Sequence, residues 1–553
     1  MMNRAITIND TDNVAVALTD LSKGEVIRIN DEDFTLTENI QAKHKIAIKD
    51  FRKGDEIYMY GVIVGMTNQA VGKGEPITTQ NVEHRASSYE LEQKKQVSWT
   101  PPDVSKWKDK TFNGYHRSDG QVGTANYWLV FPLVFCENRN VEVIKKTFEK
   151  ALGLEKQVQY ESYLNSLVDQ YKSNGAQISD MGLTPMPEVP ENIPDNPELF
   201  ENVDGIRFLT HDGGCGGVRQ DSETLCRLLA GYVNNPNVAG ATVLSLGCQN
   251  AEVQIFEDAL KKINPEFDKP VIILDQQNTG TEQELIAKAI KETFLGLIEA
   301  NKIKREPAPL SKLTIGLECG GSDGFSGISA NPAIGYTSDL LVALGGTVIL
   351  SEFPELCGVE QELINRAVHK SSAEKFIKLM RAYEKAAENV GSGFDMNPSP
   401  GNIKDGLITD AMKSAGAAKK GGSSPVNDIL DYTEYATNPG LNLLCTPGND
   451  VESTTGLAGS GANIILFTTG LGTPTGNPVT SVIKVSSNSQ LVQRMPDIID
   501  VNTGPVIEGE KTIEVMGGEI LDQVIRVASG ETVTKAMQLR QYDFIPWKRG
   551  VSL

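Results

Sequence analysis

The chain has 553 residues, too many for a single hydrophobic core, so two to four domains are expected. Hydrophobic residues make up 39% and charged residues 22%, a composition that excludes a disordered or fibrous chain. A net charge of −20 argues against nucleic acid as a partner, and no apolar run is long enough to make a membrane the partner. Seven scattered cysteines and an N-terminus without an apolar signal core favour a reducing cytoplasm.

Residues 1 to 90 predict a small β domain. Short alternating runs at 26–29 and 57–60 indicate strands, and Lys-Gly-acid turns stand at 23–25, 53–55 and 73–75. Glycine supplies the backbone conformation that such turns require. The polar stretch at 91–112, with Pro101 and Pro102, is predicted to be a linker.

Residues 113 to 305 and 306 to 553 predict two α/β units. In the first, strands are expected at 127–135, 206–210, 241–246 and 271–274, and helices near 141–152, 220–233, 251–263 and 281–302. A proline-containing excursion, 176–203, separates its first two strands. In the second unit, strands are expected at 313–317, 346–351, 441–445 and 463–468, with helices near 359–390. Strands that alternate with helices predict mainly parallel sheets covered on both faces.

Five of the seven cysteines stand where a predicted strand meets a loop, namely Cys136, Cys215, Cys248, Cys319 and Cys445. Ligands bind at the carboxyl ends of strands in open parallel sheets. Cys136, Cys215 and Cys248 are therefore candidate ligands for iron, and both a mononuclear ion and an iron–sulfur cluster remain open. The alternative is that cysteine is a small residue that tolerates a buried strand end. Cys226 is expected in the core, and the pattern leaves Cys357 undecided.

Two histidines are candidates for a site. His211 follows a strand beside Asp212 and is predicted to be a ligand or a proton carrier; the alternative is a histidine bonded to loop backbone. His44 begins a strand of the β domain and can reach a site formed between domains.

Acidic and basic candidates follow the strands of the second unit. Glu352 comes directly after the strand at 346–351 and is predicted to be a metal ligand or general base; the alternative is a solvated connection. Lys404, Lys419 and Lys420 lie in glycine-rich loops. One of them can pair with a substrate carboxylate, or act as a base if it is desolvated.

The stretch GLECGGSDGFSG, residues 316–327, places bare backbone after a buried strand. Its N–H groups suit carboxylate or phosphate oxygens. It is neither a dinucleotide-binding G-x-G-x-x-G turn nor a P-loop. With three further polar glycine loops it predicts a ligand that carries hydroxyls and a carboxylate. The candidate binding residues are Gly320, Gly321, Ser322, Asp323, Asn402, Asn449, Asp450 and Thr473.

The motifs at 319–324, 326–328, 330–332, 397–402, 447–450 and 470–474 resemble the altronate/galactarate dehydratase family. The segments 12–18, 43–45 and 60–61 are similar to the family's SAF-type β-clip domain, so the implied fold is that domain followed by two α/β units. The resemblance runs from about residue 8 to the end of the chain, and the altronate branch is closer. The chain departs from the family pattern at 213–221 and at 77–80. At 77–80 the family's His-x-His pair is missing; if that pair holds metal, His84 is the candidate that would replace it.

The resemblance implies a hydro-lyase that uses Fe²⁺ or Mn²⁺ to convert D-altronate to 2-dehydro-3-deoxy-D-gluconate and water in hexuronate catabolism. Galactarate or another aldarate or aldonate is the alternative substrate. A carbohydrate-binding protein without activity is a rival, as is a nicotinamide-dependent oxidoreductase, which the missing G-x-G-x-x-G turn disfavours. A homodimer is the expected assembly. The candidate catalytic residues are His211, Glu352 and Lys404, and the candidate metal ligands are Cys136, Cys215, Cys248 and His44.

Overall fold

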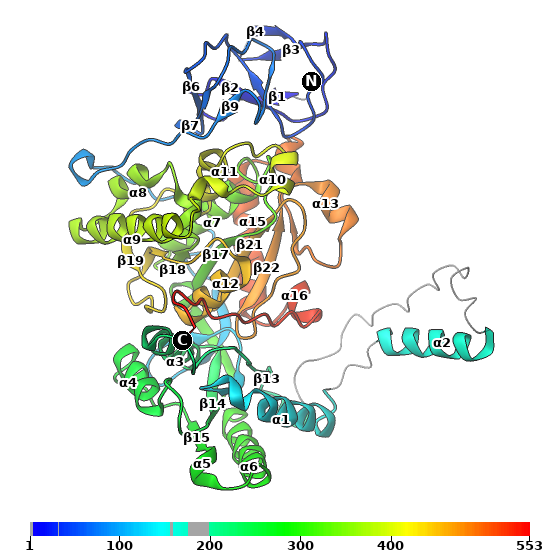
Figure 1. Cartoon of the computed structure of the whole chain (residues 1–553), viewed down its shortest axis with the longest axis vertical. Coiled ribbons are helices and arrows are strands. Elements are labelled where there is room, and N and C mark those ends of the chain that lie inside the picture. The colour runs from blue at the N-terminus through cyan, green and yellow to red at the C-terminus, as the bar shows by residue number, and fades with distance from the viewer. Residues whose placement is uncertain (1–3, 31, 155–158, 175–197, 553) are drawn as a thin grey trace.

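The structure is a computed structural model that describes residues 4–30, 32–154, 159–174 and 198–552. Three units follow one another along the long axis of the molecule (Figure 1). The N-terminal domain lies at one end, the C-terminal unit in the centre, and the middle unit at the other end. Among the described residues, no helix combines the length and the apolar character that crossing a membrane requires.

The N-terminal domain is built from short antiparallel strands. One sheet has the order β1-β2-β5-β8, a second pairs β3 with β4, and a third has the order β6-β7-β9. Gly24, Gly54 and Gly74 have φ of 79°, 92° and 86°, so the three Lys-Gly-acid turns adopt the conformation that the sequence predicts. The bounds are β1 (Ala5–Ile6), β2 (Val14–Ala17), β3 (Val26–Ile29), β4 (Glu32–Thr35), β5 (Lys45–Ala47), β6 (Glu56–Met59), β7 (Val62–Thr67), β8 (Pro76–Ile77) and β9 (Val82–Glu83).

The segment predicted to be a linker lies against the C-terminal unit. It contains the short 3₁₀ helix η1 (Leu91–Gln93). Trp107 Nε1 donates a hydrogen bond to Asp522, which also pairs with Lys106 and Lys110. These contacts hold the connection in place along the surface of the C-terminal unit.

The middle unit is a parallel sheet of order β13-β12-β14-β15, entered and left through the antiparallel pair β10 and β16. The predicted strand 127–135 ends at Pro132 because a 3₁₀ turn follows, and most of segment 176–203 lies outside the described residues. The strands are β10 (Thr111–His116), β11 (Val122–Gly123), β12 (Tyr127–Pro132), β13 (Gly205–Phe208), β14 (Val238–Ser245), β15 (Val271–Asp275) and β16 (Arg305–Pro309). The helices are η2 (Phe135–Glu137), α1 (Asn138–Ala151), α2 (Gln159–Asn174), α3 (Arg219–Asn234), α4 (Val253–Ile263), α5 (Gln276–Thr279) and α6 (Glu282–Ala300).

The C-terminal unit contains a seven-stranded parallel sheet of order β19-β20-β18-β17-β21-β22-β23. The four predicted strands correspond to β17, β18, β20 and β21, at the centre of the sheet, and β19, β22 and β23 were not predicted. The strands are β17 (Thr314–Cys319), β18 (Thr347–Leu350), β19 (Val426–Leu430), β20 (Gly440–Leu444), β21 (Ile464–Thr469), β22 (Ser481–Ser486) and β23 (Val501–Asn502).

Helices cover this sheet, and α10 and α11 lie on the side of the unit that faces the N-terminal domain in Figure 1. Apolar residues of β2, β6 and β7 join the same hydrophobic cluster as β17 and α7, so the two units share a core. The main helices are η4 (Leu310–Lys312), α7 (Ala330–Ala343), η5 (Phe353–Leu356), α8 (Glu360–Arg366), α9 (Lys370–Asn389), η6 (Phe394–Met396), α10 (Pro400–Lys404), α11 (Asp410–Ala417), η7 (Ala418–Gly421), α12 (Asp450–Gly459), α13 (Ser489–Arg494), α14 (Gly504–Ile507), α15 (Ile513–Ala528) and α16 (Lys535–Gln538).

Candidate active site and metal centre

The carboxyl edge of the seven-stranded sheet holds a buried cluster of charged side chains. Glu318 and Cys319 end β17, Glu352 follows β18, and Glu355 lies in η5. All four are at most 2% exposed. Such a cluster needs compensating positive charge. Burying an unpaired carboxylate removes its shell of water and costs on the order of several kcal/mol of folding free energy.

Two lysines supply that charge. Lys420 Nζ lies 2.8 Å from Glu352 Oε2, and Lys413 Nζ of α11 lies 2.6 Å from Glu355 Oε1. Cys319 Sγ lies 3.3 Å from a Glu352 oxygen and 3.0 Å from a Glu355 oxygen, so its one proton can be donated to either carboxylate. The cluster is therefore a closed network of two ammonium groups, one thiol and two carboxylates, with Glu318 beside it.

The environment separates the protonation states of the carboxyl groups. Burial, and then the neighbouring Glu352, raise the pKa of Glu318 well above its ordinary value, so Glu318 keeps its proton. Burial also acts on Glu355, but Lys413 and Lys420 outweigh it and lower its pKa, so Glu355 stays ionised. Carboxyl groups of one cluster whose pKa values are shifted in opposite directions are typical of acid and base residues in enzymes.

Asp450, the first residue of α12, stands at the margin of this cluster and is only partly buried. Burial first, and then Glu352 and Glu355, raise its pKa to about 7. A carboxyl group that titrates near neutral pH is suited to accept and return a proton.

The backbone at Glu352 is strained. Its φ of 67° and ψ of 63° place a non-glycine residue in the left-handed region. The conformation is held by a hydrogen bond of 2.8 Å from the Glu352 N–H to Thr446 Oγ1 and by the pair with Lys420. Strain of about 1–3 kcal/mol at one residue is found mainly at functional sites.

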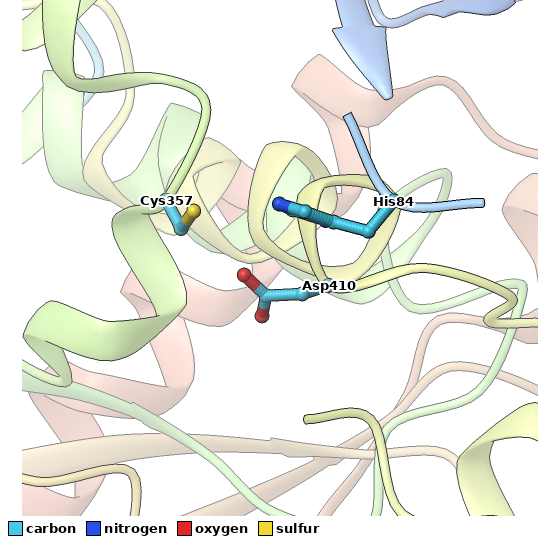
Figure 2. Close-up of side chains that lie close together, drawn as sticks. All are labelled: His84, Cys357 and Asp410. Atoms are coloured by element: carbon cyan, nitrogen blue, oxygen red, sulfur yellow. The ribbon is translucent and has the colours of Figure 1, made fainter. Parts of the chain in front are cut away.

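A second group consists of three side chains that lie close together (Figure 2). His84 follows β9 of the N-terminal domain, Cys357 follows η5, and Asp410 begins α11. One ligand-type atom from each lies within 4.8 Å of the others. The two groups share elements, because Lys413 is one turn after Asp410 on α11 and Glu355 is two residues before Cys357.

A divalent cation fits the His84 group better than the buried cluster. Cys319, Glu352 and Glu355 also place ligand atoms within 4.8 Å, but two ammonium groups already neutralise them. Asp410 is 1% exposed, and within the described part of the chain its Oδ2 has no hydrogen-bond partner. Nitrogen, sulfur and oxygen donors around an unsatisfied carboxylate form a donor set suited to a first-row transition metal.

The N-terminal domain contacts the C-terminal unit through residues 43–45. Lys43 Nζ lies 3.0 Å from Asp323 Oδ2 and 2.9 Å from Asp405 Oδ1. His44 Nε2 lies 3.1 Å from the carbonyl oxygen of Lys404. Beside Lys43 a cavity of about 370 Å³ opens between the two units, lined in part by Thr19, Phe325, Asn488, Ser489 and Glu508.

The glycine loop at 320–327 forms much of this contact. A Cβ added at Gly324 would lie 2.5 Å from the carbonyl oxygen of Lys43, and one at Gly327 would lie 2.3 Å from the Tyr60 hydroxyl. Asp323, fully buried, accepts hydrogen bonds from Ser326, Ser487 and Asn488 as well as Lys43. In this structure the loop therefore serves the docking of two domains, which the sequence did not predict.

Other predicted binding residues also make internal contacts. Asn402 completes a capping box on α10 and donates to the Ser322 carbonyl oxygen, at 2.6 Å. The Asn449 side chain caps α12, and the Thr473 carbonyl oxygen accepts from Lys484. A Cβ at Gly320 would lie 2.1 Å from Asp450 Oδ2, and Gly321 has a φ of 61°. Asp450 and Gly320 are thus the predicted binding residues that adjoin the charged cluster.

The three predicted catalytic residues lie on different elements, and one of them lies in another unit. Glu352 belongs to the charged cluster, whereas Lys404 is exposed at the end of α10. His211 lies in the middle unit, where its Nε2 donates to the Pro132 carbonyl oxygen at 2.8 Å and its Nδ1 accepts from the Gly213 N–H at 3.2 Å. Burial lowers the pKa of His211, which keeps the ring neutral. This geometry matches the alternative, a histidine bonded to loop backbone.

The four predicted metal ligands do not form one centre. The loops of Cys136, Cys215 and Cys248 adjoin, because Phe135 N–H donates to Gly213 and Asn250 N–H donates to Gly214. All three cysteines are exposed, and they do not form a group within 4.8 Å among the described residues. His44 belongs to the N-terminal domain, and the C-terminal unit separates that domain from the middle unit, which contains the three cysteines (Figure 1). Cys226 is buried in α3, as predicted.

Several residues of the site escaped the sequence analysis. Lys413 and Asp410 lie on α11, a helix of mostly small residues with no distinctive motif, and Cys357 was left undecided. Glu355 did not escape: with Glu352 and Glu360 it forms the acidic stretch after the strand at 346–351, where the sequence predicts a metal ligand or general base without choosing Glu355. A usable signal was the spacing of Asp410 and Lys413, which puts an acid and a base on one helix face.

Comparison with known proteins covers all three units. Residues 3–85 match the SAF domain of altronate/galactarate dehydratases, 114–301 match the second domain of D-galactarate dehydratase/altronate hydrolase, and 310–552 match the C-terminal domain of D-galactarate/altronate dehydratase. The matched models are those of dehydratases, so all three units of the chain are those of an enzyme of the hydro-lyase class.

Full-length relatives give the same result. The chain is 34% identical to an altronate dehydratase of Bacillus subtilis, over 96% of both chains, and 32% identical to an altronate dehydratase of Escherichia coli, over 99% of both. It is 30% identical to a galactarate dehydratase (L-threo-forming) of Escherichia coli, over 96% of this chain and 93% of the relative. The chain belongs to the altronate/galactarate dehydratase family.

Proposed function

We propose that this sugar-acid dehydratase acts on D-altronate, removing water to give 2-dehydro-3-deoxy-D-gluconate, and that it requires Fe²⁺ or Mn²⁺. The two relatives at 34% and 32% identity are altronate dehydratases, which supports this substrate over galactarate. The structural observation that supports the reaction type is the buried cluster of Glu318, Glu352 and Glu355 near Asp450, in which Glu318 keeps its proton and Glu355 stays ionised.

The reaction breaks a C–H bond beside the substrate carboxylate and a C–O bond on the next carbon. The proton goes to a base, the hydroxyl leaves as water with a proton from an acid, and the enol product rearranges to the ketone. We assign the base to Asp450, because it is partly accessible and its pKa of about 7 suits proton transfer at neutral pH.

Glu355 and Lys413 hold the charge balance around that base. Lys413 is anchored to Glu355 and to Asn397 Oδ1, at 3.0 Å, and its side chain is 11% exposed. Its ammonium group would keep Glu355 neutralised when a substrate carboxylate binds, while Glu352 and Lys420 fix the buried floor of the site. A bound divalent cation would add stabilisation of the negative charge that develops on the carboxylate.

The direct test is product formation from a panel of aldonates and aldarates. Purified protein is incubated under reducing conditions, with and without Fe²⁺ or Mn²⁺, and 2-keto-3-deoxy acids are measured. We expect the highest kcat/KM with D-altronate. Faster turnover of galactarate would reassign the substrate, and no turnover of any sugar acid would reject the proposal.

Variants at the assigned base sharpen the test. Asp450→Asn should lower kcat by about 100-fold or more, the usual contribution of a general base. Glu452→Gln, two residues further along α12, is the matched control and should keep most of the activity. The homodimer and the cytoplasmic location expected from the sequence remain predictions.

A further inference from the structure

We propose that His84, Cys357 and Asp410 bind a divalent metal ion, Fe²⁺ in preference to Mn²⁺, where the N-terminal domain meets the C-terminal unit. That the ion is one of the two metals, iron or manganese, rests on the proposed function; the ligand set does not. The geometry of the site stands by itself.

The three ligands come from three chain segments that converge at one point (Figure 2). The side chains of His84, Cys357 and Asp410 point toward a common space, with their ligand-type atoms within 4.8 Å of one another. Gly358, with φ of 88°, makes this approach possible. A Cβ at this position would lie 3.3 Å from Ala411 Cβ and 3.4 Å from Ala86 Cβ, so all three segments pack around it.

The Asp410 side chain has a buried oxygen without a hydrogen-bond partner. The residue is 1% exposed, and within the described ranges its Oδ2 accepts no hydrogen bond. The cation one helical turn away, Lys413, is already bound to Glu355 and Asn397. A buried carboxylate oxygen without a partner is costly, and a metal ion at this point would satisfy it.

The donor set selects the type of metal. Imidazole and thiolate ligands favour borderline transition metals, whereas Mg²⁺ and Ca²⁺ prefer oxygen ligands throughout. Affinity for a given site rises from Mn²⁺ to Fe²⁺ in the usual order of divalent metals, which favours iron. Three protein ligands leave coordination positions open, as in catalytic metal sites, and half-exposed His84 leaves the site accessible.

The position of the site links metal binding to the charged cluster. Asp410 and Lys413 share α11, and Cys357 follows η5, which carries Glu355. His84 belongs to the N-terminal domain, so the centre is complete only when that domain is docked. We therefore expect metal binding to strengthen the docking of the two units.

Metal binding to the full-length protein tests the proposal without any activity assay. Protein prepared without oxygen is loaded with Fe²⁺ or Co²⁺ and desalted, and its metal content is measured by mass spectrometry. We expect one retained ion per chain. The Co²⁺ form should show a sulfur-to-cobalt charge-transfer band, which Cys357→Ser should abolish.

His84→Ala and Asp410→Asn should weaken the affinity for Co²⁺ beyond the roughly 10- to 100-fold that loss of an outer-sphere partner costs. The matched controls are Cys136→Ser, Cys215→Ser and Cys248→Ser, which should keep both the ion and the band. Circular dichroism establishes which variants fold. His84→Ala alters a half-exposed side chain, so it decides the question if Asp410→Asn fails to fold.

The proposal is overturned if the wild-type chain retains no metal, or if the band and the ion survive in Cys357→Ser and His84→Ala. It is overturned equally if the controls at Cys136, Cys215 or Cys248 lose the ion. These readouts are independent of the substrate panel. Metal bound here without turnover rejects the proposed function alone, and turnover with unchanged metal in the variants rejects the site alone.

Discussion

The two parallel sheets of the molecule use the same topological position differently. At the carboxyl edge of the middle sheet, Cys136, Cys215 and Cys248 lie exposed in adjoining loops. At the corresponding edge of the C-terminal sheet, Glu318, Cys319, Glu352 and Glu355 are at most 2% exposed, and side chains of α11, η7 and α12 pack against them. The end of a parallel strand thus gives only the position of a possible site. Burial by further elements is what shifts the pKa values of acids and bases toward those that catalysis needs.

The largest expected effect is at the covered edge. Lys420→Met removes the cation that neutralises Glu352, so it should destabilise the protein by about 3–5 kcal/mol. The measurement is the free energy of unfolding in urea. The neighbouring half-buried Lys419, changed to Met, is the control and should cost less than about 1 kcal/mol. A small effect at Lys420 would mean that the buried pair does not support the fold.

The second expected effect concerns pH. Burial raises the pKa of Glu360 from 4.5 to about 7, so the folded state favours the neutral form. The contribution of Glu360 to the free energy of unfolding is full below about pH 4.5 and is lost as the pH rises through about 7. The free energy of unfolding should fall by about 3 kcal/mol over this range.

Glu360→Gln should remove that part of the pH dependence, since the amide stays neutral. Urea unfolding at about pH 5 and about pH 8 measures the difference. Glu362→Gln, whose side chain is 45% exposed, is the matched control. The prediction would be contradicted if the free energy of unfolding changed equally between the two pH values in wild type and in Glu360→Gln.

A smaller effect is expected at the uncovered edge. His211→Ala leaves the Pro132 carbonyl oxygen and the Gly213 N–H without their partner, which should cost about 1–3 kcal/mol of stability. If the histidine is structural, kcat should stay within about threefold of wild type. A fall of about 100-fold or more in a folded variant would restore the predicted role as a proton carrier.

The smallest effect is expected at Lys404. Its side chain is exposed, so Lys404→Ala should change the free energy of unfolding by less than about 0.5 kcal/mol and leave kcat close to wild type. Its backbone carbonyl still accepts from His44 in the variant. Loss of turnover would return this residue to the active site.

The sequence predicts the fold better than the site. Periodicity locates the central strands of both sheets, and the turns at Gly24, Gly54 and Gly74 are correct, because these features depend on neighbouring residues. The outer strands β19, β22 and β23 escape prediction, since β22 and β19 interrupt their apolar runs with polar residues and β23 has two residues only. Glu352 is the one predicted catalytic residue inside the cluster.

The remaining residues of the site are brought together by tertiary contacts, which a local pattern does not reveal. Nothing local marks Lys413 as the partner of Glu355, or Asp410 as the neighbour of His84, because these pairs come from distant segments. The glycines at 324 and 327 are a related case. Their pattern indicates bare backbone correctly, but the surface that approaches it is Lys43 and Tyr60 of another domain.

The contact of Lys43 with Asp405 has a consequence for biosynthesis, because 362 residues separate the two in sequence. At ribosomal rates of about 5–20 residues per second, the N-terminal domain emerges roughly 20 to 70 s before its partner surface exists. During that interval the domain has to fold alone, with the apolar residues of β6 and β7 facing water. A chaperone that shields nascent chains would find its first target there.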